Sequence, residues 1–259
     1  MIDKIHPILA FSDNYIWAAI SSSENKCAVV DPGDATPVIE FLEANGLELT
    51  HILITHHHPD HTGGLKELIT RYAPTVYGPE PSGIDGITHF LYEGDEIELY
   101  GTTFNILEVP GHTLDHIAYN GISASPEILF CGDTLFAAGC GRIFEGTPVM
   151  MEQSLSKLSS LAPSTQVYCT HEYTLANLKF ALAADGKNSK LLERIEIETE
   201  RRNKNQPTLP STIALELETN PFLRCEDSDV VETVSKEAGI SATSTTEVFA
   251  ALRSWKDRF

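Results

Sequence analysis

Four histidines and an aspartate lie within one short stretch of this chain, residues 55–64. Imidazole and carboxylate groups are the usual protein ligands of zinc, iron and manganese. A plain polar turn would instead favour asparagine, glycine or serine. The stretch therefore predicts a metal site, with four of these side chains as candidate ligands: His56, His58, Asp60 and His61.

The apolar, β-branched run that precedes the stretch, residues 51–55, is typical of a buried strand. Proline cannot continue a strand ladder, so Pro59 predicts that this strand ends near His57 or His58. Alternate side chains of an extended chain share a face. His56 is therefore expected to face the metals, and His57 to point away as a core or supporting residue.

Three further candidates each lie just past a predicted strand, the position where α/β folds gather their sites. His112 follows the strand 104–109, Asp133 follows the strand 128–131, and His171 follows the strand 166–169. Two cations about 3.5–4 Å apart can share a hydroxide, and a carboxylate can bridge them because its two oxygens bind separate ions. The spacing predicts a metal site, but it does not divide the seven ligands between two ions.

Composition limits the classes of function that fit this chain of 259 residues. The net charge of −19 disfavours nucleic acid and anionic membranes as partners, and it means that an anionic substrate would need a local basic site. No apolar run approaches the roughly 20 residues that span a bilayer, and residues 1–4 lack the features of a signal peptide. Five cysteines without a C-x-x-C pair favour a reducing cytoplasm.

The first part of the chain alternates strands with helices. Strands are expected at 14–20 and 26–30, and helices at 36–45 and 65–71. Thr36 with Pro37 resembles a helix start, and Gly46 resembles a helix end.

Between residues 75 and 132 the pattern changes to short strands separated by Gly, Pro, Asp and Asn. These strands are expected at 76–77, 96–99, 104–109, 116–120 and 128–131. A helix from Thr147 to about Leu161 and a last strand at 166–169 follow.

Past residue 173 the pattern predicts helices and no strand. Apolar positions mark helices near 175–182 and 191–195, Ser211 is expected to begin a third, and Ser244 with Glu247 forms a capping box before the last. We therefore expect two domains, a catalytic domain at 1–173 and a helical substrate-binding domain at 174–259.

The motifs and their order resemble the metallo-β-lactamase superfamily. They are His56-x-His58-x-Asp60-His61, Gly111-His112-Thr113, Gly132-Asp133-Thr134 and the run 169–173, CTHEY. Four further segments are similar to the hydroxyacylglutathione hydrolase (glyoxalase II) family within it: residues 13–15, 132–147, 171–181 and 220–224. This second resemblance covers essentially the whole chain.

The resemblance implies an α/β fold, a four-layer αββα sandwich followed by an all-helical C-terminal domain. It implies two divalent metal ions, zinc first and iron or manganese as alternatives. One ion would have His56, His58 and His112 as ligands. The other would have Asp60, His61 and His171, with Asp133 bridging and Asp60 also orienting the attacking hydroxide.

The implied reaction is hydrolysis of an S-(2-hydroxyacyl)glutathione, S-D-lactoylglutathione giving glutathione and D-lactate in the second step of methylglyoxal detoxification. A cytoplasmic monomer without nucleic-acid or membrane partners is expected. The glutathione-binding residues carry over to Arg142, Phe144, Tyr173, Arg253 and Lys256. Phe144 stands where some relatives carry a tyrosine, and Thr170 where glycine is common.

Arg253 and Lys256 are three residues apart and so share one face of the last helix, where they could clamp a carboxylate. The alternative is that they only complement the helix dipole.

Two other functions remain open. Superfamily members with one iron oxidise glutathione persulfide, and these are expected to lack the helical tail. A non-catalytic metal-binding scaffold would bind metal without turnover. Hydrolases of β-lactams, lactones or tRNA precursors share the metal motif but not residues 132–147.

Overall fold

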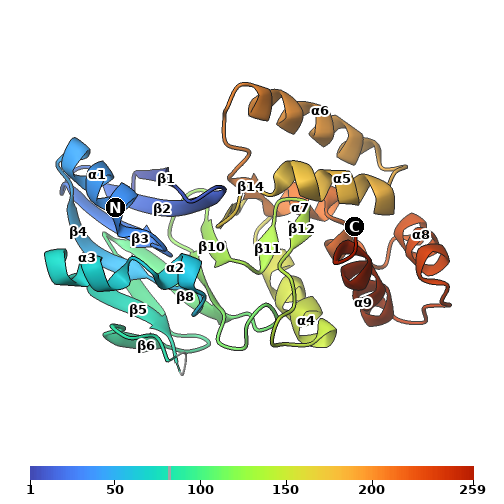
Figure 1. The fold of residues 1–259 in the computed structure, drawn as a ribbon, viewed down its shortest axis with the longest axis horizontal. Coiled ribbons are helices and arrows are strands. Elements are labelled where there is room, and N and C mark those ends of the chain that lie inside the picture. Colours follow the sequence, from blue (N-terminus) through green and yellow to red (C-terminus); the bar gives the residue numbers. More distant parts are fainter. Residues whose placement is uncertain (81–82) are drawn as a thin grey trace. The chain divides into compact units, whose positions relative to one another are not determined.

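The computed structural model (Figure 1) describes residues 1–80 and 83–259. The chain divides into two compact units. Unit 1 comprises Met1–Glu108 and Asp115–Gly132. Unit 2 comprises Val109–Leu114 and Asp133–Phe259. The loop that carries His112 therefore belongs to unit 2, although the segments on either side of it belong to unit 1.

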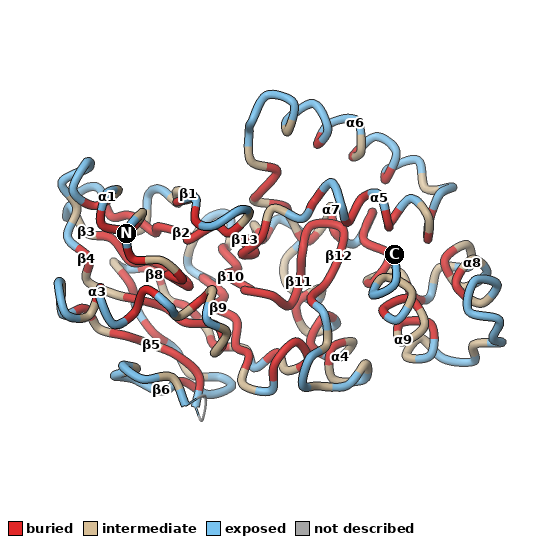
Figure 2. Tube along the Cα trace, viewed as in Figure 1, coloured by how far each residue is buried: buried red, intermediate tan, exposed pale blue. Residues whose placement is uncertain are grey.

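Unit 1 contains a six-stranded sheet in which the strands follow one another in chain order. They are β1 (Lys4–Ala10), β2 (Asn14–Ser21), β3 (Lys26–Val30), β4 (Glu48–Leu53), β5 (Thr75–Pro79) and β6 (His89–Leu91). The first three are antiparallel neighbours, and β3 to β6 run parallel. All eight residues of β2 are buried, as its apolar run predicts (Figure 2).

Parallel strands need a crossover, and helices supply it here. Helix α1 (Ala35–Asn45) joins β3 to β4, and the short α2 (Pro59–Thr62) and α3 (Leu65–Tyr72) join β4 to β5. Val38 and Leu42 of α1 and Leu68 of α3 are buried in one core with side chains of the sheet. A fully buried Val or Leu side chain contributes about 1.5–3 kcal/mol, so this contact holds the helices on the sheet.

The start of α1 differs from the prediction. The helix begins at Ala35, and its N-cap is Asp34, whose carboxylate accepts a hydrogen bond from the Thr36 N–H at 2.9 Å. Aspartate caps a helix as well as threonine does, and here the earlier residue takes the role. Gly46 ends the helix in the left-handed conformation, with φ of 64°.

Unit 1 also contains four antiparallel strands that lie against the first sheet. They are β7 (Glu96–Leu99), β8 (Thr102–Glu108), β9 (Ile117–Gly121) and β10 (Ile128–Gly132), and each pairs with the next. The hydroxyl of Tyr119 on β9 donates to the Ile54 carbonyl at 2.8 Å, which connects the two sheets. Unit 1 thus supplies a helical layer and two sheet layers (Figure 1).

Unit 2 is mainly helical. Its elements are β11 (Leu135–Phe136), β12 (Gly139–Cys140), α4 (Pro148–Ser159), β13 (Gln166–Cys169), α5 (Thr174–Ala184), α6 (Ser189–Asn203), β14 (Ser211–Thr212), α7 (Ile213–Thr219), the 3₁₀ helix η1 (Pro221–Leu223), α8 (Ser228–Ala238) and α9 (Thr245–Lys256). Leu178 of α5 and Leu191 of α6 are buried against each other's helix, as their spacing predicts.

Three further predictions about the elements are wrong. The segment past residue 173 does contain a strand, because β14 pairs antiparallel with β13. Ser211 lies in that strand, and α7 begins at Ile213 with Thr212 as its N-cap. β4 ends at Leu53 rather than near His57, because the Thr55 carbonyl accepts from Ile117 N at 2.9 Å and the chain leaves the first sheet there.

Some short strands were also missed: β1, which holds Pro7 at the sheet edge, and β6, β11 and β12. Within the described parts of the chain, no helix is long and apolar enough to cross a bilayer.

Candidate active site

Unit 1 brings together the predicted ligands of the histidine-rich stretch. After β4 the chain runs without regular structure to His58, and the single turn of α2 then carries His61 back beside His56. The ring centroids of His56 and His61 are 4.0 Å apart, and those of His56 and His58 are 4.7 Å apart. His61 Nε2 lies 3.5 Å from Asp60 Oδ2. The four candidates of this stretch therefore face one another.

Asp31, which was not among the candidate residues expected from the sequence, holds this group in place. Its carboxylate is buried and accepts hydrogen bonds from Thr55 N at 2.8 Å and Thr55 Oγ1 at 2.7 Å. Its Oδ2 also lies 3.0 Å from His61 Nδ1. A carboxylate at Nδ1 keeps the proton on that nitrogen and leaves Nε2 as the nitrogen that can bind a metal.

A signal for Asp31 does exist in the sequence. It directly follows the strand β3, which runs parallel to β4. Parallel neighbours end at the same sheet edge, so a carboxylate just past β3 is expected beside the residues just past β4.

Gly33 permits the close approach of α2 to the loop after β3. A Cβ at Gly33 would lie 1.9 Å from the Asp60 carbonyl oxygen, so Gly33→Ala must displace the turn that carries Asp60 and His61. We expect this variant to lose metal content and about 1–3 kcal/mol of unfolding free energy. Elemental analysis and urea unfolding would measure both.

Gly46→Ala is the matched control, because its φ is 64° but nothing lies within 4 Å of the added Cβ. It should lose only about 1–2 kcal/mol through backbone strain and keep its metal. Equal metal content in the two variants would contradict the expected role of Gly33.

Two neighbouring histidines lie beside these ligands. His57 Nδ1 is 2.9 Å from Asp115 Oδ1. The His116 ring stacks on His56 with centroids 4.6 Å apart. His57, Asp115 and His116 thus place further imidazole and carboxylate groups beside the candidate ligands.

Unit 2 brings together the other three candidates. His112 Nε2 and His171 Nε2 each lie 3.4 Å from the same oxygen, Asp133 Oδ2, and all three residues are buried. His112 Nδ1 is 2.7 Å from the Arg142 carbonyl oxygen, which holds the ring in the same way as Asp31 holds His61. The His171 ring stacks on Tyr173 at 4.6 Å.

Both groups of side chains fit divalent cations. Each places an imidazole Nε2 near a carboxylate oxygen, His61 near Asp60 and His112 near Asp133, with Nδ1 of His61 and of His112 held by an oxygen. Nitrogen and carboxylate oxygen donors accept zinc, iron and manganese. The chemistry of the donors therefore agrees with the predicted metal site and does not choose among these metals.

The predicted substrate-binding residues all lie in unit 2. Phe144 and Tyr173 are exposed, and the Phe144 ring centroid is 5.3 Å from that of His112. Arg142 is also exposed, and its Nε donates to Asp257 Oδ1 at 3.1 Å. Arg142 contacts His112 through its backbone carbonyl, Phe144 lies beside the His112 ring, and Tyr173 stacks on His171.

Arg253 and Lys256 share a face of α9 but differ in environment. Arg253 is buried, and its Nη1 donates to the Cys140 carbonyl at 2.9 Å. Lys256 is only partly buried, with Nζ 4.9 Å from the Phe180 ring centroid. Burial first, and then the charge of Arg253, lowers the pKa of Lys256 to about 8.

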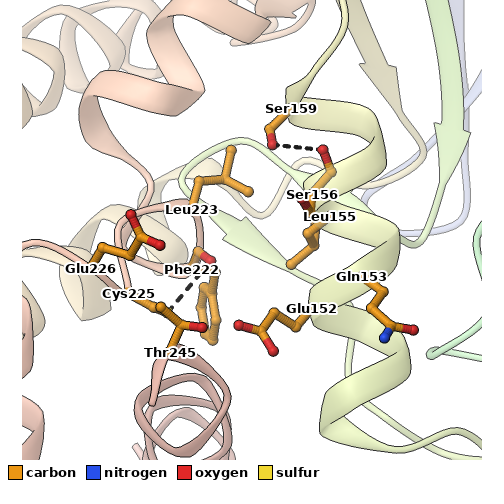
Figure 3. Close-up of a pocket in the computed structure, with 10 residues that line it drawn as sticks. All are labelled: Glu152, Gln153, Leu155, Ser156, Ser159, Phe222, Leu223, Cys225, Glu226 and Thr245. Carbon is orange, nitrogen blue, oxygen red and sulfur yellow. Dashed lines mark hydrogen bonds between the residues drawn. The ribbon is translucent and has the colours of Figure 1, made fainter. Parts of the chain in front are cut away.

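A separate cleft of about 300 Å³ lies in unit 2 between α4, η1 with the segment after it, and the start of α9 (Figure 3). It is lined by two carboxylates, Glu152 and Glu226, together with hydroxyls and the apolar Leu155 and Phe222. None of its lining residues is a predicted site residue, and its carboxylates would repel an anionic substrate.

Two family models together match residues 14–259 of the chain. Residues 14–171 match the metallo-beta-lactamase superfamily, and residues 172–259 match the hydroxyacylglutathione hydrolase C-terminus. A hydroxyacylglutathione hydrolase from Pseudomonas aeruginosa is 49% identical over 257 residues, which is 99% of both chains. One from Photobacterium profundum is 50% identical over 98% of this chain and 99% of the relative.

Solved structures show the same fold. ETHE1 from Myxococcus xanthus superposes with a TM-score of 0.66 at 23% identity and covers 98% of both chains. TTHA1623 in a di-iron-bound form gives a TM-score of 0.61 at 24% identity over 84% of this chain and 100% of that chain. The expected metallo-β-lactamase sandwich with a C-terminal helical region is confirmed. The chain belongs to the hydroxyacylglutathione hydrolase family of the metallo-β-lactamase superfamily.

Proposed function

We propose that this protein hydrolyses S-(2-hydroxyacyl)glutathione thioesters, with S-D-lactoylglutathione giving glutathione and D-lactate in the second step of methylglyoxal detoxification. The observation that carries the proposal is 49% identity to a hydroxyacylglutathione hydrolase over 99% of both chains. The likeness includes the C-terminal region, which matches a family model of its own.

The proposed cofactor is a pair of divalent metal ions. His56, His58 and His112 would hold one ion, and Asp60, His61 and His171 the other. Asp133 would bridge them, and its approach by two imidazole Nε2 atoms supports that role. Zinc is the metal we expect first, with iron and manganese as alternatives. The ions would supply Lewis-acid polarisation of the thioester carbonyl and acidification of a water molecule.

The protein's own residues would bind and orient the substrate. Asp60 accepts a hydrogen bond from Asn14 Nδ2 at 3.2 Å, which leaves its carboxylate placed to orient the attacking water. A thiol has a pKa near 8.5, so the glutathione thiolate leaves without a strong general acid. Arg142, Arg253 and Lys256 would concentrate positive charge for glutathione carboxylates, with Phe144 and Tyr173 beside them.

We also propose a division into a catalytic domain at 1–173 and a helical substrate-binding domain at 174–259. Its support is that α9 supplies Arg253 and Lys256, and that the two family models meet at residues 171 and 172. A monomer in the cytoplasm is proposed as well. The five cysteines, all among the described residues, are buried thiols, which suits a reducing compartment. Sedimentation of the purified protein tests the monomer.

The test of the function is thiol release from S-D-lactoylglutathione by metal-loaded protein, with a chelated sample as control. Rapid release that chelation abolishes would support the proposal. Absence of release by protein that holds two metal ions would contradict it. Oxygen uptake with glutathione persulfide would then identify the dioxygenase alternative.

The pKa of Lys256 predicts how KM changes with pH. Its ammonium is charged below about pH 8 and loses the charge above it. The KM for S-D-lactoylglutathione should therefore stay level below neutrality and rise through pH 8. A charge-assisted hydrogen bond contributes about 1.5–3 kcal/mol, so the rise should reach about tenfold or more. Steady-state kinetics from pH 6 to 9.5 would measure it, with Lys256→Met as the control.

The Lys256→Met variant should have a raised KM at every pH, and this KM should no longer rise through pH 8. If it kept the wild-type rise through pH 8, another group would be responsible.

A further inference from the structure

The segment Cys140-Gly141-Arg142 packs directly against two of the candidate metal ligands. A Cβ at Gly141 would lie 1.9 Å from the Asp133 carbonyl oxygen and 3.2 Å from His112 Nδ1, so the backbone there touches both residues. The Arg142 carbonyl accepts from His112 Nδ1 at 2.7 Å. Any shift of this segment would move the His112 ring.

Helix α9 also holds this segment, through Arg253. Arg253 Nη1 donates to the Cys140 carbonyl at 2.9 Å and to the Gly141 carbonyl at 3.4 Å. Its guanidinium carbon lies 5.1 Å from the Phe222 ring centroid. Because Arg253 is buried and bonded to these carbonyls, its position is fixed by the fold.

Asp257, the residue directly after α9, joins the two arginines. Its Oδ1 accepts from Arg253 Nη2 at 3.1 Å and from Arg142 Nε at 3.1 Å. Its backbone carbonyl is 3.5 Å from Arg142 Nη2. One carboxylate therefore orients the exposed Arg142 side chain against the fixed Arg253, and it offsets the repulsion between two guanidiniums.

The ion pair between Arg142 and Asp257 orients the Arg142 side chain and contributes little to the free energy of unfolding. The Arg142 and Asp257 side chains are 54% and 36% exposed, and water screens an ion pair of that kind. An arginine without such a partner samples many rotamers, and binding must then restrict it again. Holding Arg142 before the substrate arrives removes that cost.

We propose that Asp257 is a positioning residue for the substrate: it holds the Arg142 guanidinium, on the segment whose backbone also holds His112, ready for an anionic group of the glutathione moiety. This inference rests on the proposed function. Asp257 was not among the residues expected from the sequence to take part in the site.

The test compares wild type with Asp257→Ala, Arg142→Ala, the double variant and the control Asp229→Ala. Asp229 forms an exposed ion pair with Lys187 in the same unit, with side-chain exposure of 43%. Asp257→Asn, which keeps the shape of the side chain, is included in case the alanine variant folds poorly. The measurements are kcat and KM for S-D-lactoylglutathione, and the calorimetric Kd for glutathione.

Asp257→Ala is expected to raise KM and the glutathione Kd about fivefold, with kcat within about twofold of wild type. Arg142→Ala should give a similar change. The double variant should be no worse than the more affected single variant, because both remove one contact. Asp257→Asn should show a smaller change in the same direction, and Asp229→Ala none.

Unchanged constants in both Asp257 variants would overturn the proposal, as would effects of Asp257→Ala and Arg142→Ala that multiply. A fall in KM would overturn it too, because the carboxylate would then only repel the anionic substrate. Absence of thiol release by wild type would count against the proposed function alone, provided that Asp257→Ala still weakens glutathione binding. Wild type that neither turns over nor binds glutathione would overturn both.

Discussion

Asp133→Ala is expected to lower kcat/KM for S-D-lactoylglutathione by about 10³-fold or more, since several kcal/mol of charge stabilisation depend on the metal pair. The metal content should fall below two ions per chain. The reason is that Asp133 is the carboxylate approached by Nε2 of both His112 and His171, each at 3.4 Å. Without it, two cations would lose the anion that offsets their repulsion. Elemental analysis and steady-state kinetics would measure both effects.

Cys131→Ala is the matched control for that variant. Cys131 is buried in β10, two residues before Asp133, which directly follows that strand, so its replacement disturbs the same part of the fold. It should keep two ions and a rate close to wild type. If Asp133→Ala also kept two ions and its full rate, the proposed bridging role would be wrong.

Asp31→Ala is expected to weaken metal binding about 10- to 100-fold, the usual cost of losing a residue that orients a ligand. Asp31 is not one of the proposed metal ligands, but its carboxylate accepts from Thr55 and lies 3.0 Å from His61 Nδ1. Removing it leaves buried donors unpaired, which should also lower the unfolding free energy of the metal-free protein by about 2–4 kcal/mol. Competition with a zinc chelator and urea unfolding would measure the two effects.

Asp34→Ala separates the two effects of Asp31→Ala. Asp34 lies in the same loop and caps α1, so its loss should cost about 1 kcal/mol of stability without changing metal affinity. An Asp31→Ala protein that is destabilised but binds zinc as tightly as wild type would contradict the orienting role of Asp31.

Elements whose signals lie within a few residues could be predicted from the sequence. Thr147 accepts from Met150 N and begins α4, and Ser244 accepts from Glu247 N and begins α9. The strands expected at 14–20, 26–30, 96–99 and 128–131 agree closely with the observed bounds of β2, β3, β7 and β10. Such elements depend on hydrogen bonds or apolar periodicity inside the segment itself, so the local residues are sufficient to specify them.

Elements that depend on a distant partner could not be predicted in this way. β14 consists of two residues, both polar, and it is a strand because Thr212 pairs with Gln166. β4 ends at Leu53 because the chain soon turns to β9, where Ile117 N donates to the Thr55 carbonyl, and the run of apolar residues does not reveal this. Pro7 concealed β1, although an edge strand tolerates proline.

The sequence by itself determined the family, the order of the motifs and the candidate metal ligands, because short motifs in a given order are a property of the chain alone. Only the tertiary structure decided what holds those ligands. Asp31 reaches His61 across 30 residues, and Asp257 reaches Arg142 across 115. Contacts of that range depend on sheet register and helix packing, which bring together residues that share no local pattern.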